Sequence, residues 1–117
     1  MVFEGVELNK AKKREAPAPV KPVTHNGLRY EVVHWGRTRG LSQNGGYIAV
    51  IDPDIDKEVG LIKVYPVKYK WWGMEKDKQD IFITEIELDA KSESLLVSDE
   101  RSRRYRVEIE SQKVQKL

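Results

Sequence analysis

The chain has 117 residues and a formal net charge of +2, with 34% charged and 39% hydrophobic residues. That length corresponds to one domain, and a composition of mixed sign is unlike that of a disordered chain. Because the sequence has no cysteine, disulfide frameworks, thiol nucleophiles and cysteine-bound zinc are excluded. The low net charge argues against a protein whose main task is to hold duplex DNA.

The first residues and the hydropathy pattern indicate where the protein works. Residues 1–5 carry an acid where a secretory leader carries basic residues. No apolar run approaches the ~18 residues of a membrane span. We therefore expect a cytoplasmic protein without a membrane partner.

Residues 1–26 form a leader rich in lysine and proline. Pro17, Pro19 and Pro22 impose an extended path, because each proline fixes φ and disfavours helix in the residue before it. We interpret this segment as a disordered arm. It is either a solvated terminus or a basic tail that contacts an acidic partner.

Residues 27–111 are expected to form a single β domain, with residues 112–117 as a tail. Two apolar, β-branched runs at 47–51 and 59–67 flank an Asp/Pro turn, which predicts an antiparallel strand pair. Further strands are expected at residues 28–35, 81–88, 95–97 and 103–109. The sequence thus predicts an all-β antiparallel meander of about six strands, arranged as one blade-like sheet, a small barrel or a sandwich.

The period of two assigns side chains to the faces of these strands. In the last strand, Tyr105, Val107 and Ile109 are expected to point inward. Residues expected to share one face of the strand at 81–88 are Phe82, Thr84, Ile86 and Leu88. Pairs between Glu85 or Glu87 and Arg104 or Arg106 are predicted across neighbouring strands.

Catalytic and metal-binding patterns are weak. Asp52, Asp54 and Asp56 alternate like the start of a calcium loop, but lysines occupy the two most demanding later positions of that loop. The aspartates are better explained by turn chemistry. His25 and His34 are the only histidines, and no spacing links them to a nucleophile or a metal. We expect no cofactor and no metal, and a hydrolase or metal enzyme is a distant alternative.

Two loops carry candidate binding residues. Tyr69, Lys70, Trp71 and Trp72 interleave large aromatic side chains with lysines. They either close one end of the domain, form a protein interface, or stack nucleobases while Lys68, Lys70, Lys76 and Lys78 contact phosphates. The second candidate is an anion-binding loop with Arg37 and Arg39, within the glycine-rich residues 36–46.

Residues 46–61 resemble one blade unit of the quinoprotein-type β-propeller repeat, through Gly46-Tyr47-Ile48-Ala49-Val50-Ile51-Asp52 and the later Lys57-Glu58 pair. The turn lacks the Thr-Gly of that repeat, and the usual tryptophan is absent. The unit occurs once, so the quinone cofactor does not carry over. The stretch from Arg29 to Ile109 is also similar to a group of small uncharacterised bacterial proteins, which implies a bacterial source and no known activity.

The sequence therefore favours a non-catalytic binding or assembly module that uses the aromatic and basic loop. Its expected partner is another protein or a second copy of itself. A nucleic-acid-binding module is the alternative.

Overall fold

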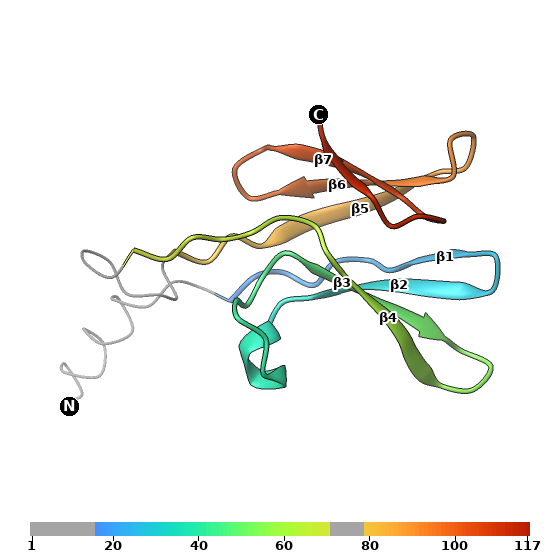
Figure 1. The fold of residues 1–117 in the computed structure, drawn as a ribbon, viewed down its shortest axis with the longest axis horizontal. Helices are drawn as coiled ribbons and strands as arrows, with labels where there is room; N and C mark the ends of the chain where they lie inside the picture. Colours follow the sequence, from blue (N-terminus) through green and yellow to red (C-terminus); the bar gives the residue numbers. More distant parts are fainter. Residues whose placement is uncertain (1–15, 71–78) are drawn as a thin grey trace, which may run out of the picture.

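The fold is all-β, as the sequence predicts, and consists of two four-stranded antiparallel sheets that do not close into a barrel (Figure 1). The computed structural model describes residues 16–70 and 79–117. Each sheet is a meander of consecutive strands, β1-β2-β3-β4 and β5-β6-β7-β8. The strands are β1 (Val23–His25), β2 (Leu28–Val33), β3 (Tyr47–Asp52), β4 (Lys57–Lys63), β5 (Ile83–Asp89), β6 (Ser94–Asp99), β7 (Arg104–Glu108) and β8 (Val114–Lys116). A short 3-10 helix, η1 (Gly36–Arg39), follows β2.

The structure has eight strands where the sequence predicts about six. The additional strands, β1 and β8, are short and lie in the segments assigned to the leader and the tail. β1 pairs with β2 through Asn26 and Gly27, which both adopt positive φ, at 51° and 79°. Asn-Gly is a strong signal for a two-residue hairpin. The domain is predicted to begin at residue 27, so the strand before this pair is not among the expected elements.

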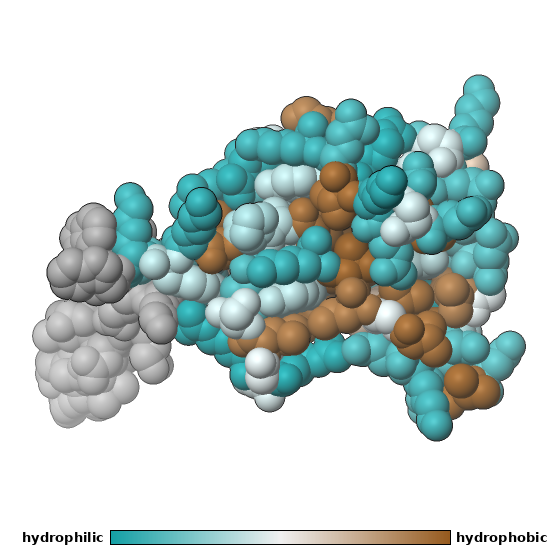
Figure 2. Space-filling view, viewed as in Figure 1, coloured by the Kyte–Doolittle hydropathy of each residue, from teal (hydrophilic) through white to brown (hydrophobic). Residues whose placement is uncertain are grey.

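The hydrophobic core lies between the two sheets. Tyr30, Ile48 and Ile62 from the first sheet and Leu95 and Val107 from the second are at most 4% exposed and belong to one cluster. Figure 2 shows hydrophobic residues in a band across the middle of one face, with hydrophilic residues on both sides of it. Fully burying such a side chain contributes about 1.5–3 kcal/mol. Packing between the sheets therefore holds the domain together as a sandwich.

The expected faces are correct in β7 and partly wrong in β5. Tyr105 and Val107 are buried, as predicted. In β5, however, Ile83 is buried and Thr84 is exposed. The pairing of β5 with β6 shifts register between Ile83 and Glu85. This irregularity reverses the alternation at the start of the strand, and a pattern of period two does not detect it.

The predicted pairs between the glutamates of β5 and the arginines of β7 are wrong. β6 lies between the two strands. Leu96 of β6 therefore pairs with Glu87 on one side and with Arg106 on the other. Arg106 instead donates to Asp89 at 3.2 Å and to Ser92 at 2.9 Å. In a meander, alternate strands such as β5 and β7 are separated by the strand between them, whereas the predicted pairs require them to be neighbours.

The proline-rich residues 16–22 follow an extended path beside β2 and β5. Val20 packs against the core, and the Ala18 carbonyl lies 3.0 Å from His34 Nε2. Prolines lack the N–H that would continue the β1–β2 ladder. The segment therefore covers two strand edges without extending either sheet. The sequence predicts a disordered arm over residues 1–26. Residues 1–15 of it lie outside the described part of the chain, and Val23–His25 form strand β1.

Candidate functional site

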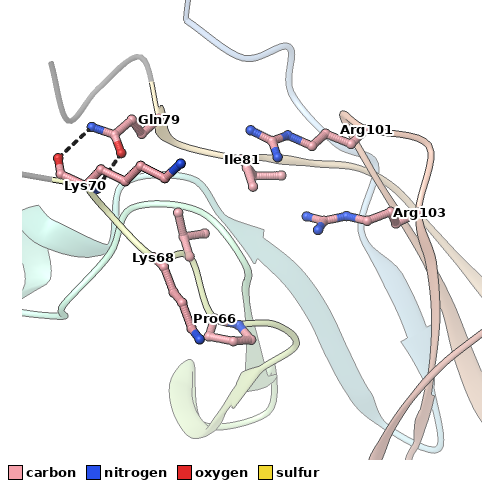
Figure 3. Close-up of a pocket in the computed structure, with 8 residues that line it drawn as sticks. Pro66, Lys68, Lys70, Gln79, Ile81, Arg101 and Arg103 are labelled. Carbon is pink, nitrogen blue, oxygen red and sulfur yellow. Dashed lines mark hydrogen bonds between the residues drawn. The ribbon is translucent and has the colours of Figure 1, made fainter. Parts of the chain in front are cut away.

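The clearest candidate site is a cleft between the connection that follows β4 and the turn that joins β6 to β7 (Figure 3). Its volume is about 370 Å³. The described residues that line it are Pro66, Val67, Lys68, Lys70, Gln79, Ile81, Arg101 and Arg103. Four of these eight side chains are cations and none is a carboxylate. We call this site the basic cleft.

The wall that carries the two lysines is fixed by a buried amide. Gln79, 8% exposed, accepts a hydrogen bond from the Lys70 backbone N–H at 2.6 Å and donates to the Lys70 carbonyl at 3.1 Å. These two bonds hold the backbone of Lys70 on both sides. The Lys70 side chain then extends into the cleft from this wall (Figure 3).

The opposite wall is organised by a buried carboxylate. The Asp99 side chain is 0% exposed and accepts hydrogen bonds from the backbone N–H groups of Arg101 at 2.8 Å and Arg103 at 3.1 Å. It also accepts from Arg103 Nε at 2.8 Å and from the Tyr105 hydroxyl at 3.0 Å. The turn that carries both arginines is therefore fixed by one side chain, and Arg101 and Arg103 extend toward Lys70 (Figure 3).

The charge state of Asp99 follows from these contacts. Burial alone would raise the pKa of Asp99, but the N–H groups of Arg103 and Arg101, together with the Tyr105 hydroxyl, outweigh burial and lower it. Burial and the Asp99 carboxylate raise the pKa of Tyr105 to about 12. At neutral pH the cluster therefore holds an ionised carboxylate, a neutral phenol and a guanidinium cation.

Two stacked tyrosines connect the cleft to the core. The rings of Tyr65 and Tyr105 are 5.2 Å apart at an angle of 24°, and the Arg103 guanidinium lies 5.8 Å from the centre of the Tyr65 ring. The Tyr65 hydroxyl donates to the Ile81 carbonyl at 2.7 Å. Tyr65 thus contacts Ile81 and Arg103, which both line the cleft, and its burial raises its pKa.

A second buried amide supports the floor of the cleft from the glycine-rich loop. Gln43, 2% exposed, donates to the carbonyls of Gly45 and Tyr65, both at 2.9 Å, and accepts from the Val67 N–H at 2.8 Å. Buried polar groups are costly unless they are paired. The position of Val67 at the cleft therefore depends on a residue far away in the sequence.

Gly45 in the same loop allows the backbone to approach the segment before β5 closely. A Cβ atom on Gly45 would lie 2.3 Å from the Ile81 carbonyl oxygen. No side chain fits there without moving one of the two backbones. The loop is shaped for packing at this point, which the sequence does not distinguish from anion binding.

The two arginines predicted to bind an anion have separate intramolecular partners. The Arg37 guanidinium lies 4.5 Å from the centre of the Tyr69 ring, and Arg39 Nη2 bonds both carboxylate oxygens of Glu58 at 2.6 Å. Neither arginine lines the basic cleft. Their role in anion binding stays a prediction.

The aromatic and basic loop is only partly described. The Tyr69 hydroxyl donates to Asp80, which also accepts from Asn44 at 3.0 Å, so Tyr69 is held in a polar cluster beside the cleft. Burial and the bond to Asp80 raise the pKa of Tyr69 to about 12. Trp71 and Trp72, together with Lys76 and Lys78, lie outside the described residues.

The sequence predicts a binding role for Lys68 and Lys70 but none for the arginines of the cleft. Arg103 falls in the strand expected at residues 103–109, and Arg101 lies just before it. The available signal was the spacing of Asp99, Arg101 and Arg103, because an aspartate often bonds backbone N–H groups two residues further along a turn. That spacing does not reveal what the turn faces.

Residues 16–70 and 79–117 lack two further features, a metal-ligand cluster and a membrane-spanning helix. They contain no group of three histidine, aspartate or glutamate side chains that could hold a metal ion. They also contain no helix long and apolar enough to cross a membrane.

Comparison with known proteins gives no match, either to a protein-family model, to a curated protein or to a solved structure. The resemblance of residues 46–61 to a propeller blade, and that of the longer stretch to small bacterial proteins, therefore stay predictions.

Proposed function

We propose that this protein is a non-catalytic binding module, and that the basic cleft takes an acidic segment of a protein partner. The observation that carries the proposal is that four of the eight described lining residues are cations and none is a carboxylate. Figure 3 shows Lys70, Arg101 and Arg103 extending toward one another, whereas the Lys68 side chain points away, toward Pro66. Arg103 already has a counter-charge in Asp99. The carboxylates of an acidic segment would be attracted to the cations that line the cleft.

The rigidity of both walls supports a binding role. Gln79 fixes the backbone at Lys70, and Asp99 fixes the turn with Arg101 and Arg103. A preorganised site loses less conformational entropy when it binds than a flexible one does.

The size and floor of the cleft favour a peptide. Val67 and Ile81 supply apolar surface to the lining of the cleft, and Figure 3 places Ile81 between Lys70 and Arg103. This lining suits a segment that alternates acidic and apolar side chains. Proteins that bind nucleic acids generally present longer basic stripes, and the net charge of the chain is only +2.

Single-stranded nucleic acid is the second candidate, because two guanidinium groups lie beside two ammonium groups. Arg101 and Arg103 offer planar forks that match phosphate oxygens, while Lys68 and Lys70 act as point charges. The cytoplasmic location and the bacterial source expected from the sequence remain part of the proposal.

A titration with two probes tests the proposal. The probes are a fluorescent poly-glutamate peptide and a fluorescent oligothymidylate of similar charge, each at low and moderate salt. The cleft variant carries Lys70→Glu and Arg101→Glu. The control variant carries Arg104→Glu and Lys116→Glu, which change the net charge equally at exposed positions on β7 and β8.

We expect the peptide to bind the wild type and the control variant, and to bind the cleft variant at least about tenfold more weakly. Equal weakening in both variants would show that only net charge matters and would overturn the assignment to the cleft. Tighter binding of the oligothymidylate, with a steep dependence on salt, would favour the second candidate.

A further inference from the structure

We propose that the acidic segment bound by the basic cleft is the β3–β4 hairpin of a second copy of this chain, so that copies associate head to tail. The inference rests on the proposed function, because it names the occupant of the same cleft. It is carried by the chemistry of the hairpin, by its exposure and by its position in the molecule.

The turn of this hairpin has the charge that the cleft lacks. Asp52, Asp54 and Asp56 alternate along it, with Lys57 as the neighbouring cation. Asp52 Oδ1 accepts a hydrogen bond from the Asp54 N–H at 3.0 Å, which fixes the turn. Asp54 and Asp56 are exposed. Two carboxylates are thus presented to solvent on a preformed turn, opposite in charge to the four cations of the cleft.

The same hairpin exposes apolar side chains. Ile55 lies between the two exposed aspartates and is 57% exposed, and Val59 is 54% exposed. Val59 has no partner in the β3–β4 ladder, because the ladder passes from the Val50–Gly60 pair directly to the Ile51–Glu58 pair. Figure 2 shows hydrophobic residues at the lower right, where Figure 1 places this hairpin. Ile55 is the side chain suited to the apolar floor formed by Val67 and Ile81.

The β5–β6 turn also carries acids but is a poorer ligand. In the β5–β6 turn, Asp89 is already bonded to Arg106 and accepts from the Ser92 N–H at 3.5 Å. That turn has no apolar residue comparable to Ile55 in exposure. The β3–β4 hairpin therefore fits the cleft better in both charge and apolar surface.

The hairpin and the cleft lie at opposite ends of the molecule. In Figure 1 the turn between β3 and β4 is at the lower right, and the turn between β6 and β7, which carries Arg101, is at the left. One chain therefore cannot fill its own cleft with its own hairpin. Contact between the two surfaces is heterologous, and such contacts extend into chains of subunits or close into rings.

This contact is expected to be weak. A hairpin tip in a cleft of about 370 Å³ buries much less surface than the roughly 1,200 Å² at which stable protein interfaces begin. The attraction between exposed charges is also screened by salt. Self-association should therefore appear only at high protein concentration and should weaken as salt is added.

Complementary blocking of the two surfaces tests the inference by sedimentation velocity. The hairpin variant carries Asp54→Lys and Asp56→Asn, where asparagine suits the positive φ of 52° at residue 56. Its control carries Glu85→Lys and Glu87→Gln, which change the net charge equally at exposed positions on β5. The cleft variant and its control are those described above.

We expect the wild type and both controls to form species beyond the dimer as concentration rises. The hairpin variant alone and the cleft variant alone should remain monomeric. An equimolar mixture of the two should form a one-to-one dimer that grows no further, because only one intact cleft and one intact hairpin can meet. The mixture should associate at least about tenfold more tightly than either variant alone.

A wild type that is monomeric at every concentration would overturn the inference. So would a hairpin variant that associates like the wild type, or a mixture that forms no dimer. The poly-glutamate titration separates this failure from that of the proposed function. If the peptide binds the cleft of the wild type and of the hairpin variant while the wild type stays monomeric, the cleft has another acidic partner. If the peptide does not bind either protein, both proposals fail.

Discussion

Arg103 Nε lies 2.8 Å from Asp99 Oδ2, and this pair joins the core to the rim of the basic cleft. The carboxylate is completely buried, whereas the Arg103 side chain is 32% exposed. A buried charge persists only where it is paired and hydrogen-bonded. Asp99 meets that condition and also sets the direction of the guanidinium group, so stability and binding depend on the same side chain.

Replacing Asp99 with asparagine should destabilise the protein and weaken the cleft together. The amide cannot accept from all four donors that now reach Asp99, and it leaves Arg103 without its counter-charge. We expect the free energy of unfolding in urea to fall by about 2–3 kcal/mol. Exposed Glu85→Gln is the control and should stay within about 0.5 kcal/mol of the wild type. A loss of that small size in Asp99→Asn would contradict the assigned role.

Acid should remove the contribution of Asp99 to the free energy of unfolding. Its pKa in the folded protein lies below its ordinary value, which is about 3.9 in unfolded chains. A lowered pKa stabilises the folded state above the unfolded value, and that stability is lost as the pH falls through the lower, folded value. Urea unfolding of the wild type should therefore weaken below about pH 4 more steeply than that of Asp99→Asn. Parallel curves for the two proteins would show that Asp99 is not the group responsible.

Gly45→Ala should be strongly destabilising, although glycine-to-alanine changes often stabilise loops. The new Cβ would lie 2.3 Å from the Ile81 carbonyl oxygen and 3.1 Å from the Phe82 ring. Either the loop or the start of β5 must shift, and overpacking of this kind costs about 1–3 kcal/mol. Gly60→Ala is the matched control, because its nearest neighbours would lie at an ordinary 3.5 Å. Thermal melts of the two variants should differ in midpoint, and equal midpoints would contradict this account.

The sequence identifies elements whose signals are local. The apolar runs of β3 and β4, and the alternation of Tyr105 and Val107, predict strands because neighbouring residues alone decide them. The hairpin signal of Asn26 and Gly27 is equally local. The prolines before β1, however, favour an extended leader over a strand at this point. The order of β5, β6 and β7 depends on longer-range pairing, and for that reason the expected contacts of Glu85 and Glu87 were wrong.

Patterns among neighbouring residues do not predict the basic cleft. Lys68 and Lys70 line the same cleft as Arg101 and Arg103 only because the two sheets pack against each other. Their segments are far apart in the sequence, and no periodicity links them. Lys70 is distinctive in the sequence because Trp71 and Trp72 follow it, whereas Arg101 and Arg103 have the composition of an ordinary charged turn. Buried polar residues such as Gln43 and Asp99 carry the organising contacts, and composition alone does not separate them from surface residues.

Gln43→Leu should damage both the fold and the cleft, since Gln43 is the link between the glycine-rich loop and the cleft floor. Leucine fills a similar volume but leaves the carbonyls of Gly45 and Tyr65 and the N–H of Val67 without their partner. Each unsatisfied buried group costs about 1–3 kcal/mol, so we expect a loss of at least about 2 kcal/mol in urea unfolding. Exposed Gln115→Leu on β8 is the control. Because Val67 then loses its anchor, hydrogen exchange at residues 64–68 should also accelerate in Gln43→Leu, and unchanged protection there would contradict the proposed link.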